Sequence, residues 1–117
     1  MAKITSLTAE RLLSGDYLYR SLGALSAAGS TNPQQVNGLK NHVFQVTISN
    51  YSVDVVFKYE GSLDGTNWMN LDADNGNQTV TANGTTGYYK YDTPLEYVRI
   101  TFVSGTGTIT TQYAGSK

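Results

Sequence analysis

The chain has 117 residues, the size of one domain, and its 8 lysines and arginines against 9 aspartates and glutamates leave a net charge of −1. A chain so close to neutral lacks the basic surface with which proteins bind nucleic acid or anionic membranes, so neither is expected as a partner. It contains no cysteine, which excludes disulfides and thiolate metal sites and leaves packing or assembly to stabilise it.

The N-terminal segment, residues 1–38, has weaker patterning than the rest and is predicted to be irregular. Residues 8–15 fit one or two helical turns between a threonine N-cap and a glycine stop, and residues 16–25 alternate as a strand does. Small and polar residues dominate 26–35, which predicts a linker or long loop. Two interpretations stay open: residues 1–38 form an arm that docks on a neighbouring subunit, or they supply the first strand and a long loop.

From residue 41 onward the dominant pattern is the alternation of apolar and polar residues that marks strands with one buried face. Residues 41–49 and 53–60 alternate in this way, and the polar residues 50–52 between them predict a hairpin. Further strands are predicted over 68–71, 78–82, 86–91, the segment after Pro94, and 108–113. Roughly seven or eight short strands at this spacing predict an all-β fold, an antiparallel, jelly-roll-like β-sandwich that occupies residues 39–117.

Six residues are assigned to a tight turn and to the core of this sandwich. They are Asp64, Gly65, Trp68, Val98, Ile100 and Phe102. The Asp-Gly pair supplies the positive φ angles of a tight turn, and the tryptophan that follows is expected to be buried over one end of the core. The three other apolar residues alternate in one strand, so they are expected to face the core together.

Candidate catalytic residues are few. The single histidine, His42, has no second histidine for a metal and no nucleophile nearby in sequence, so we interpret it as an ordinary residue at a strand edge. No nucleophile-elbow, P-loop or zinc-protease motif occurs, and no two of the 9 acidic residues stand out as a glycosidase pair. We therefore expect a protein that is not an enzyme and needs no cofactor.

Asp72 and Asp74 are the weak candidate for a metal site, because oxygen ligands recur at every second residue here, as calcium prefers. The loop departs from the EF-hand pattern, which requires glycine at the sixth position and glutamate at the twelfth, where this chain has Asn77 and Asn83. A polar hairpin loop without an ion is the favoured interpretation.

Several of the nine tyrosines are candidates for a contact surface. Alternation within one strand places Tyr89 and Tyr91 on one face and Tyr88 on the other, and Tyr17 and Tyr19 alternate in the same way near the N-terminus. Tyrosine offers a large contact area at low entropic cost, so these residues indicate either a protein interface or a platform on which sugars stack. Core packing with the hydroxyl groups at the rim is the alternative.

Residues 59–71 read Tyr-Glu-Gly-Ser-Leu-Asp-Gly-Thr-Asn-Trp-Met-Asn-Leu. This segment resembles a string in small β-sandwich proteins of tailed bacteriophage particles, with a Ser-x-Asp-Gly-Thr-x-Trp motif. Tyr-Val-Arg-Ile at 97–100 and the Ser-Gly-Thr-Gly turn into a threonine-rich last strand at 104–111 also resemble that family. The same pieces resemble discoidin-type carbohydrate- or lipid-binding sandwiches, from which this chain departs by its shorter length and its lack of cysteine.

The phage resemblance implies a structural protein of the virion that decorates or cements the outside of the capsid. Its implied partners are the major capsid protein and like subunits, with a trimer as the common arrangement. Such proteins are made in the host cytoplasm, in agreement with the lack of any apolar stretch near the roughly 20 residues that cross a bilayer. The alternative is a tail or baseplate accessory protein, an adhesin that binds a host-surface glycan through exposed aromatic residues.

Overall fold

A computed structural model describes residues 3–4 and 17–117 of the chain. Within these residues the secondary structure is all β, and no helix occurs that could cross a membrane. The nine strands of this part are β1 (Lys3–Ile4), β2 (Tyr17–Leu25), β3 (Gly29–Ser30), β4 (Gln34–Leu39), β5 (Asn41–Ser62), β6 (Met69–Asn70), β7 (Gln78–Val80), β8 (Gly84–Lys90) and β9 (Leu95–Ser116).

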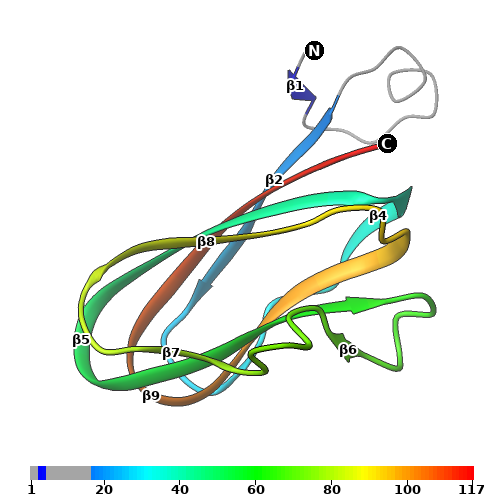
Figure 1. Cartoon of the computed structure of the whole chain (residues 1–117). Coiled ribbons are helices and arrows are strands. Elements are labelled where there is room, and N and C mark those ends of the chain that lie inside the picture. Colours follow the sequence, from blue (N-terminus) through cyan, green and yellow to red (C-terminus); the bar gives the residue numbers. More distant parts are fainter. Residues whose placement is uncertain (1–2, 5–16) are drawn as a thin grey trace.

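Two strands of 22 residues, β5 and β9, organise the fold because they pair antiparallel along most of their length. Both bend near the middle, so the sheet curls over and its two halves face each other as the layers of a sandwich (Figure 1). The first half of β5 and the second half of β9 form the first layer with β2 and β8. The other halves form the second layer with β3, β4, β6 and β7.

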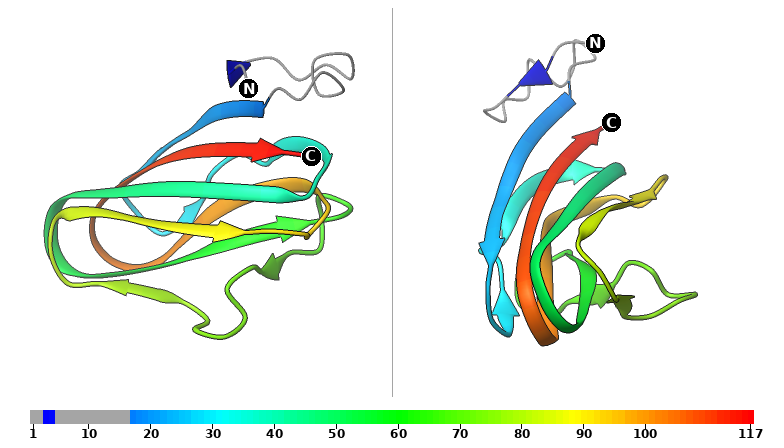
Figure 2. Two further views of the ribbon diagram at one scale, coloured as in Figure 1. Left: turned by 45° about the horizontal axis from the view of Figure 1, so that its top comes forward. Right: turned by 90° about the vertical axis from the view of Figure 1, so that its left-hand side faces the viewer.

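The predicted antiparallel, jelly-roll-like sandwich is confirmed, and Figure 2 shows the curled sheet from two further sides. The prediction of roughly seven or eight short strands missed the two long strands, β5 and β9, each of which serves both layers. A short parallel pair of β1 and β2 lies at the margin of the first layer.

The bend in β5 coincides with irregular pairing between Ser49 and Phe57, where the register with β9 shifts. Extra residues in one strand of an antiparallel pair bend that strand and increase its twist. Gly105 of β9 lies in the facing bend with a φ of 108°, and a Cβ atom there would come within 2.0 Å of the carbonyl oxygen of Asp54. The close approach of the two strands at the bend therefore requires glycine.

The prediction of a hairpin over residues 41–60 is wrong, because the two predicted strands are the two halves of one bent strand, β5. Residues 41–49 pair with β9 in the first layer, and residues 53–60 pair with β9 in the second. Asn50, with a φ of 54°, lies where the chain bends from one layer to the other. A turn-like sequence indicates where a chain changes direction, whereas the partner of each strand is decided by tertiary packing.

The core lies between the two layers and is built from the inward-facing residues of the strands. An aromatic group contributes much of it: the ring centroid of Phe44 is 5.1 Å from those of Tyr59 and Tyr113. The three residues of β9 that were expected to face the core are buried in it, namely Val98, Ile100 and Phe102.

The strand predicted over residues 16–25 corresponds to β2, which pairs with the second half of β9 and buries Leu18 completely. β3 and β4 come from the stretch predicted to be a linker and its surroundings, and they pair with the first half of β9. The helical turns predicted over 8–15 lie outside the described residues. Contact of residues 1–38 with a neighbouring subunit stays a prediction.

Candidate functional site

The loop over residues 62–68 is held by hydrogen bonds around the carboxylate of Asp64. Its Oδ1 atom accepts hydrogen bonds from the backbone N–H groups of Thr66 and Asn67, both at 2.8 Å, and from the hydroxyl of Ser62 at 3.0 Å. Asn67 also donates its side-chain amide to Oδ2 at 2.8 Å. These hydrogen bonds, the backbone amide of Asn67 foremost, hold the pKa of Asp64 well below its ordinary value. The loop is therefore shaped around an ionised carboxylate.

Gly65 turns the chain within this loop, as expected of an Asp-Gly pair. Its φ is 79°, and a Cβ atom would lie 3.3 Å from the ring of Tyr97, so a side chain would be both strained and crowded. The turn leaves Leu63 and Met69 on the surface, where they are 63% and 48% exposed.

Trp68 lies outside the core and is only partly buried. The guanidinium carbon of Arg99 is 4.0 Å from the centre of its ring, a cation–π arrangement. Arg99 faces outward because Val98 and Ile100 on either side of it fill the core. The expectation that Trp68 is buried over one end of the core is therefore corrected: the ring packs on the outer side of the second layer.

Glu60 holds Arg99 in place and is itself only 4% exposed. Its Oε1 atom accepts hydrogen bonds from Nε of Arg99 at 2.9 Å and from the hydroxyl of Thr101, and its Oε2 atom lies 3.6 Å from Nζ of Lys58. A buried carboxylate needs such partners to offset its lost hydration. The charges of Lys58, Glu60 and Arg99 are thus paired with one another.

Asp72 and Asp74, the weak candidate for a metal site, lie in a loop whose amide groups donate hydrogen bonds to Asp72. Asp72 is buried and accepts hydrogen bonds from the backbone and side chain of Asn75 and, at 2.8 Å, from the side chain of Gln78. Burial raises the pKa of Asp72, but these hydrogen bonds outweigh it, so the pKa lies below its ordinary value. Asp74 is exposed, and the described residues contain no group of three His, Cys, Asp or Glu side chains that could hold a metal.

His42 is fully buried, so its interpretation as an ordinary edge residue is corrected. Its Nε2 atom lies 2.8 Å from the carbonyl oxygen of Thr93, and its Nδ1 atom lies 2.6 Å from the hydroxyl of Tyr113. A carbonyl only accepts, so Nε2 carries the proton and Nδ1 accepts from the tyrosine. Burial lowers the pKa of His42, which keeps the ring neutral and structural.

The candidate tyrosines separate into one that packs against the core and a group on the surface. Tyr88 faces inward, where it stacks on Tyr59 with ring centroids 4.8 Å apart and donates its hydroxyl to the carbonyl of Leu71 at 2.8 Å. Tyr89 and Tyr91 face outward, are 66% and 56% exposed, and stack on each other with centroids 5.3 Å apart. Alternation thus assigned these faces correctly, and the exposed pair is the part available for contact.

Tyr17 and Tyr19 lie at the opposite margin of the first layer. Tyr19 of β2 pairs with Ala114 of β9, which pairs with Val43 of β5. Val43 pairs in turn with Tyr89 of β8, so one row of residues crosses all four strands. We call this surface, the outer side of β2, the second half of β9, the first half of β5 and β8, the tyrosine face.

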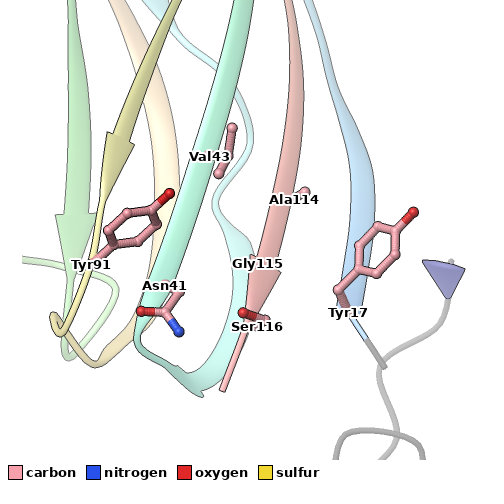
Figure 3. Close-up of a pocket in the computed structure, with 7 residues that line it drawn as sticks. All are labelled: Tyr17, Asn41, Val43, Tyr91, Ala114, Gly115 and Ser116. Atoms are coloured by element: carbon pink, nitrogen blue, oxygen red, sulfur yellow. The ribbon is translucent and has the colours of Figure 1, made fainter. Parts of the chain in front are cut away.

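Two shallow depressions meet in the middle of the tyrosine face. The first, about 220 Å³ in volume, is lined by Tyr17, Asn41, Val43, Tyr91, Ala114, Gly115 and Ser116 (Figure 3). The second, about 110 Å³, is lined by Tyr19, Val43, Gln45, Gln112, Tyr113 and Ala114. Because they share Val43 and Ala114, they form one trough with small residues and two glutamines on its floor and tyrosines at its margins.

Sequence reasoning named the tyrosines at both margins but missed the floor. The side chains of Val43, Gln45 and Gln112 face outward from their strands, and the alternation of apolar and polar residues in the sequence could have predicted this. Only the register of β5 with β9 and β2 brings them between the two groups of tyrosines.

No family model matches the chain, and a search of curated proteins finds no match. Among solved structures it is similar to the SPBc2 prophage-derived protein YomS, at 18% identity and a TM-score of 0.58 over 96% of this chain and 98% of that one. It is also similar to the C-terminal CBM6 of LamC from Zobellia galactanivorans, at 12% identity and a TM-score of 0.49 over 84% of this chain and 99% of that one. At these identities the likeness shows the fold, a β-sandwich that a prophage-derived protein shares.

Proposed function

We propose that this chain is a non-enzymatic structural subunit of a bacteriophage particle, one that decorates or cements the outer capsid surface by contacting the major capsid protein. The fold that it shares with the prophage-derived protein YomS supports a phage origin. The turn at residues 62–68, which resembles that of virion sandwich proteins, supports a role in the particle.

The observation that carries the proposal is the surface around residues 62–69, here called the Trp68 loop. Leu63 and Met69 of this loop are exposed, and Trp68 lies between them in the chain with Arg99 over its ring. Tryptophan, methionine and arginine are enriched where proteins meet, and tryptophan and arginine are frequent hot spots. The hydrogen-bonded carboxylate inside the loop holds its shape in advance, so binding would need to order little of it.

The groups best suited to catalysis are engaged in structural contacts, which supports a binding function. Glu60 pairs with outward-facing cations, Asp72 accepts from amides of its own loop, and His42 bridges a tyrosine and a backbone carbonyl. A subunit of this kind works by binding, and the weak contacts of many subunits on one capsid shell add up to strong overall attachment. We further propose that like subunits associate, with the trimer as the favoured arrangement.

Cosedimentation of the purified protein with undecorated shells of its own phage tests the proposal. The wild type is expected to bind, and a Leu63→Glu, Met69→Glu double variant is expected to lose at least about tenfold in affinity, because it forces charges into an apolar contact. Val53→Glu is the matched control, since Val53 is 56% exposed at the bend of β5, away from the loop. Failure of the wild type to sediment with shells, or unchanged binding by the double variant, would contradict the proposal.

The second candidate is a tail or baseplate accessory protein that binds host glycan. The exposed, stacked pair Tyr89 and Tyr91 favours it, because aromatic rings of this kind suit the stacking of sugars. Cross-linking of intact particles followed by mass spectrometry distinguishes the two locations. Cross-links to the major capsid protein support the first candidate, and cross-links confined to tail proteins support the second.

A further inference from the structure

We propose that the tyrosine face binds an uncharged carbohydrate chain. This inference rests on the sugar stacking considered above for Tyr89 and Tyr91, names the site and the ligand class, and is separate from attachment through the Trp68 loop. This face lies on the first layer, whereas the loop and Arg99 belong to the second. The subunit can therefore hold the particle with one surface and present the other to a ligand.

The tyrosine face carries no charge across its paired rows. Three rows cross the four strands, from Tyr19 to Tyr89, from Ser21 to Gly87 and from Ala24 to Thr85. Every residue in these rows is Tyr, Ser, Thr, Gln, Gly, Ala or Val. An ionised ligand would lose its hydration against such a surface without gaining a counter-charge, so charge complementarity selects an uncharged ligand.

The margins of the trough supply flat aromatic surfaces. The rings of Tyr89 and Tyr91 lie within 28° of parallel and are more than half exposed, so they present adjacent surfaces to the solvent. Figure 3 shows Tyr17 and Tyr91 on opposite sides of the small residues that line the first depression. The C–H faces of sugar rings pack on aromatic rings of this kind, with their hydroxyl groups left to form hydrogen bonds at the ring edges.

The floor of the trough supplies the polar groups. Gln45 and Gln112 pair across β5 and β9, and Gln112 accepts a hydrogen bond from the hydroxyl of Tyr19. Carboxamides both donate and accept, which matches the hydroxyl groups of a sugar. Three strand spacings, or roughly 14 Å, separate β2 from β8, which is wider than one sugar ring and indicates a chain of sugars.

A protein partner is the competing occupant, and the composition of the face disfavours it. Of the residue types enriched in protein interfaces, the three rows contain only tyrosine, whereas Trp68, Met69 and Arg99 gather at the Trp68 loop. The aliphatic side chains that line the trough are those of Val43 and Ala114, both small. The tyrosine face therefore offers stacking and hydrogen bonding in place of a large apolar contact.

The test is an array of uncharged hexose and N-acetylhexosamine oligosaccharides printed beside uronic-acid and sialylated ones. Each uncharged oligosaccharide that binds is then titrated into the full chain by calorimetry. We expect binding to uncharged oligosaccharides that is insensitive to added salt, because no ion pair contributes. Tyr89→Ser with Tyr91→Ser should weaken it at least about tenfold, whereas Met69→Ser, on the other layer, should leave it unchanged.

Absence of binding to uncharged oligosaccharides, a preference for acidic ones, or unchanged binding by the double tyrosine variant would overturn this inference. A dimer seen by sedimentation and dispersed by the same variant would identify a second copy as the occupant and overturn it too. Shell cosedimentation of the tyrosine variant is expected to match the wild type. Loss of sugar binding alone therefore leaves the capsid proposal intact, and loss of shell binding alone leaves this inference intact.

Discussion

The two outer faces of the sandwich come from the same two strands and differ in chemistry. On the tyrosine face, β5 turns Val43 and Gln45 outward, and no charge occurs in the three described rows. On the outer side of the second layer, the same strand turns Lys58 and Glu60 outward, and Arg99 of β9 joins them. Residues that face the core must be apolar in both layers. Residues that face outward have no such requirement, so the two outer faces can differ in chemistry.

The two faces also differ in how many contacts their side chains make within the chain. Glu60 is 4% exposed and contacts Arg99, Thr101 and Lys58, so its carboxylate is fully engaged within the chain. Tyr89 and Tyr91 contact each other but leave more than half of their surface to solvent. The outer side of the second layer is therefore occupied by contacts within the chain, while the first layer offers an open surface.

Deleting residues 1–25 is expected to have the largest effect, because it removes β2 and one margin of the tyrosine face. β2 pairs along β9 from Gly115 to Ile109, and Leu18 is fully buried, so the truncated chain would expose an edge and a strip of core. We expect aggregation or loss of the cooperative melt by circular dichroism. A truncated chain that melts like the wild type but no longer binds shells would instead identify this segment as an attachment arm.

The Glu60→Gln variant on the outer side of the second layer should lower the free energy of unfolding by about 2 kcal/mol, since it removes the negative charge that pairs with Arg99 and Lys58. Tyr89→Ser on the open face should change the free energy of unfolding by no more than about 0.5 kcal/mol. Reversible urea denaturation of both variants measures the difference. Equal losses would mean that the tyrosine pair is also a structural unit.

Acid is expected to weaken the first layer through His42. Above its ordinary pKa of 6.5 the ring is neutral in both states, and its contribution to stability is complete. Because burial lowers the folded pKa, the unfolded state gains its proton first as pH falls below 6.5, and stability falls by up to about 1.4 kcal/mol per pH unit. Urea melts between neutral and mildly acidic pH, with His42→Gln as the control, should show the slope only in the wild type.

Chelation is expected to have no effect, because amide donors already occupy the carboxylate of Asp72. The melting temperature in EDTA should equal that in buffer alone. A drop of several degrees that calcium restores would identify the loop over residues 72–77 as an ion site of the second layer.

The sequence by itself determined the fold class and the direction of most side chains. Period-2 alternation depends only on the local geometry of a strand, so it placed Val98, Ile100 and Phe102 inward and separated Tyr88 from Tyr89. The Asp-Gly turn was equally local, because its hydrogen bonds join residues within three positions of Asp64. Such features need no knowledge of the rest of the molecule.

Only the tertiary structure decided which strands pair and therefore which residues meet. The two halves of β5 looked like a hairpin, yet each pairs with β9 in a different layer. Trp68 lies outside the core against Arg99, and the trough joins Tyr19 to Val43 through Ala114 of a third strand. These contacts join residues far apart in the chain, and their geometry depends on strand register, which local alternation leaves open.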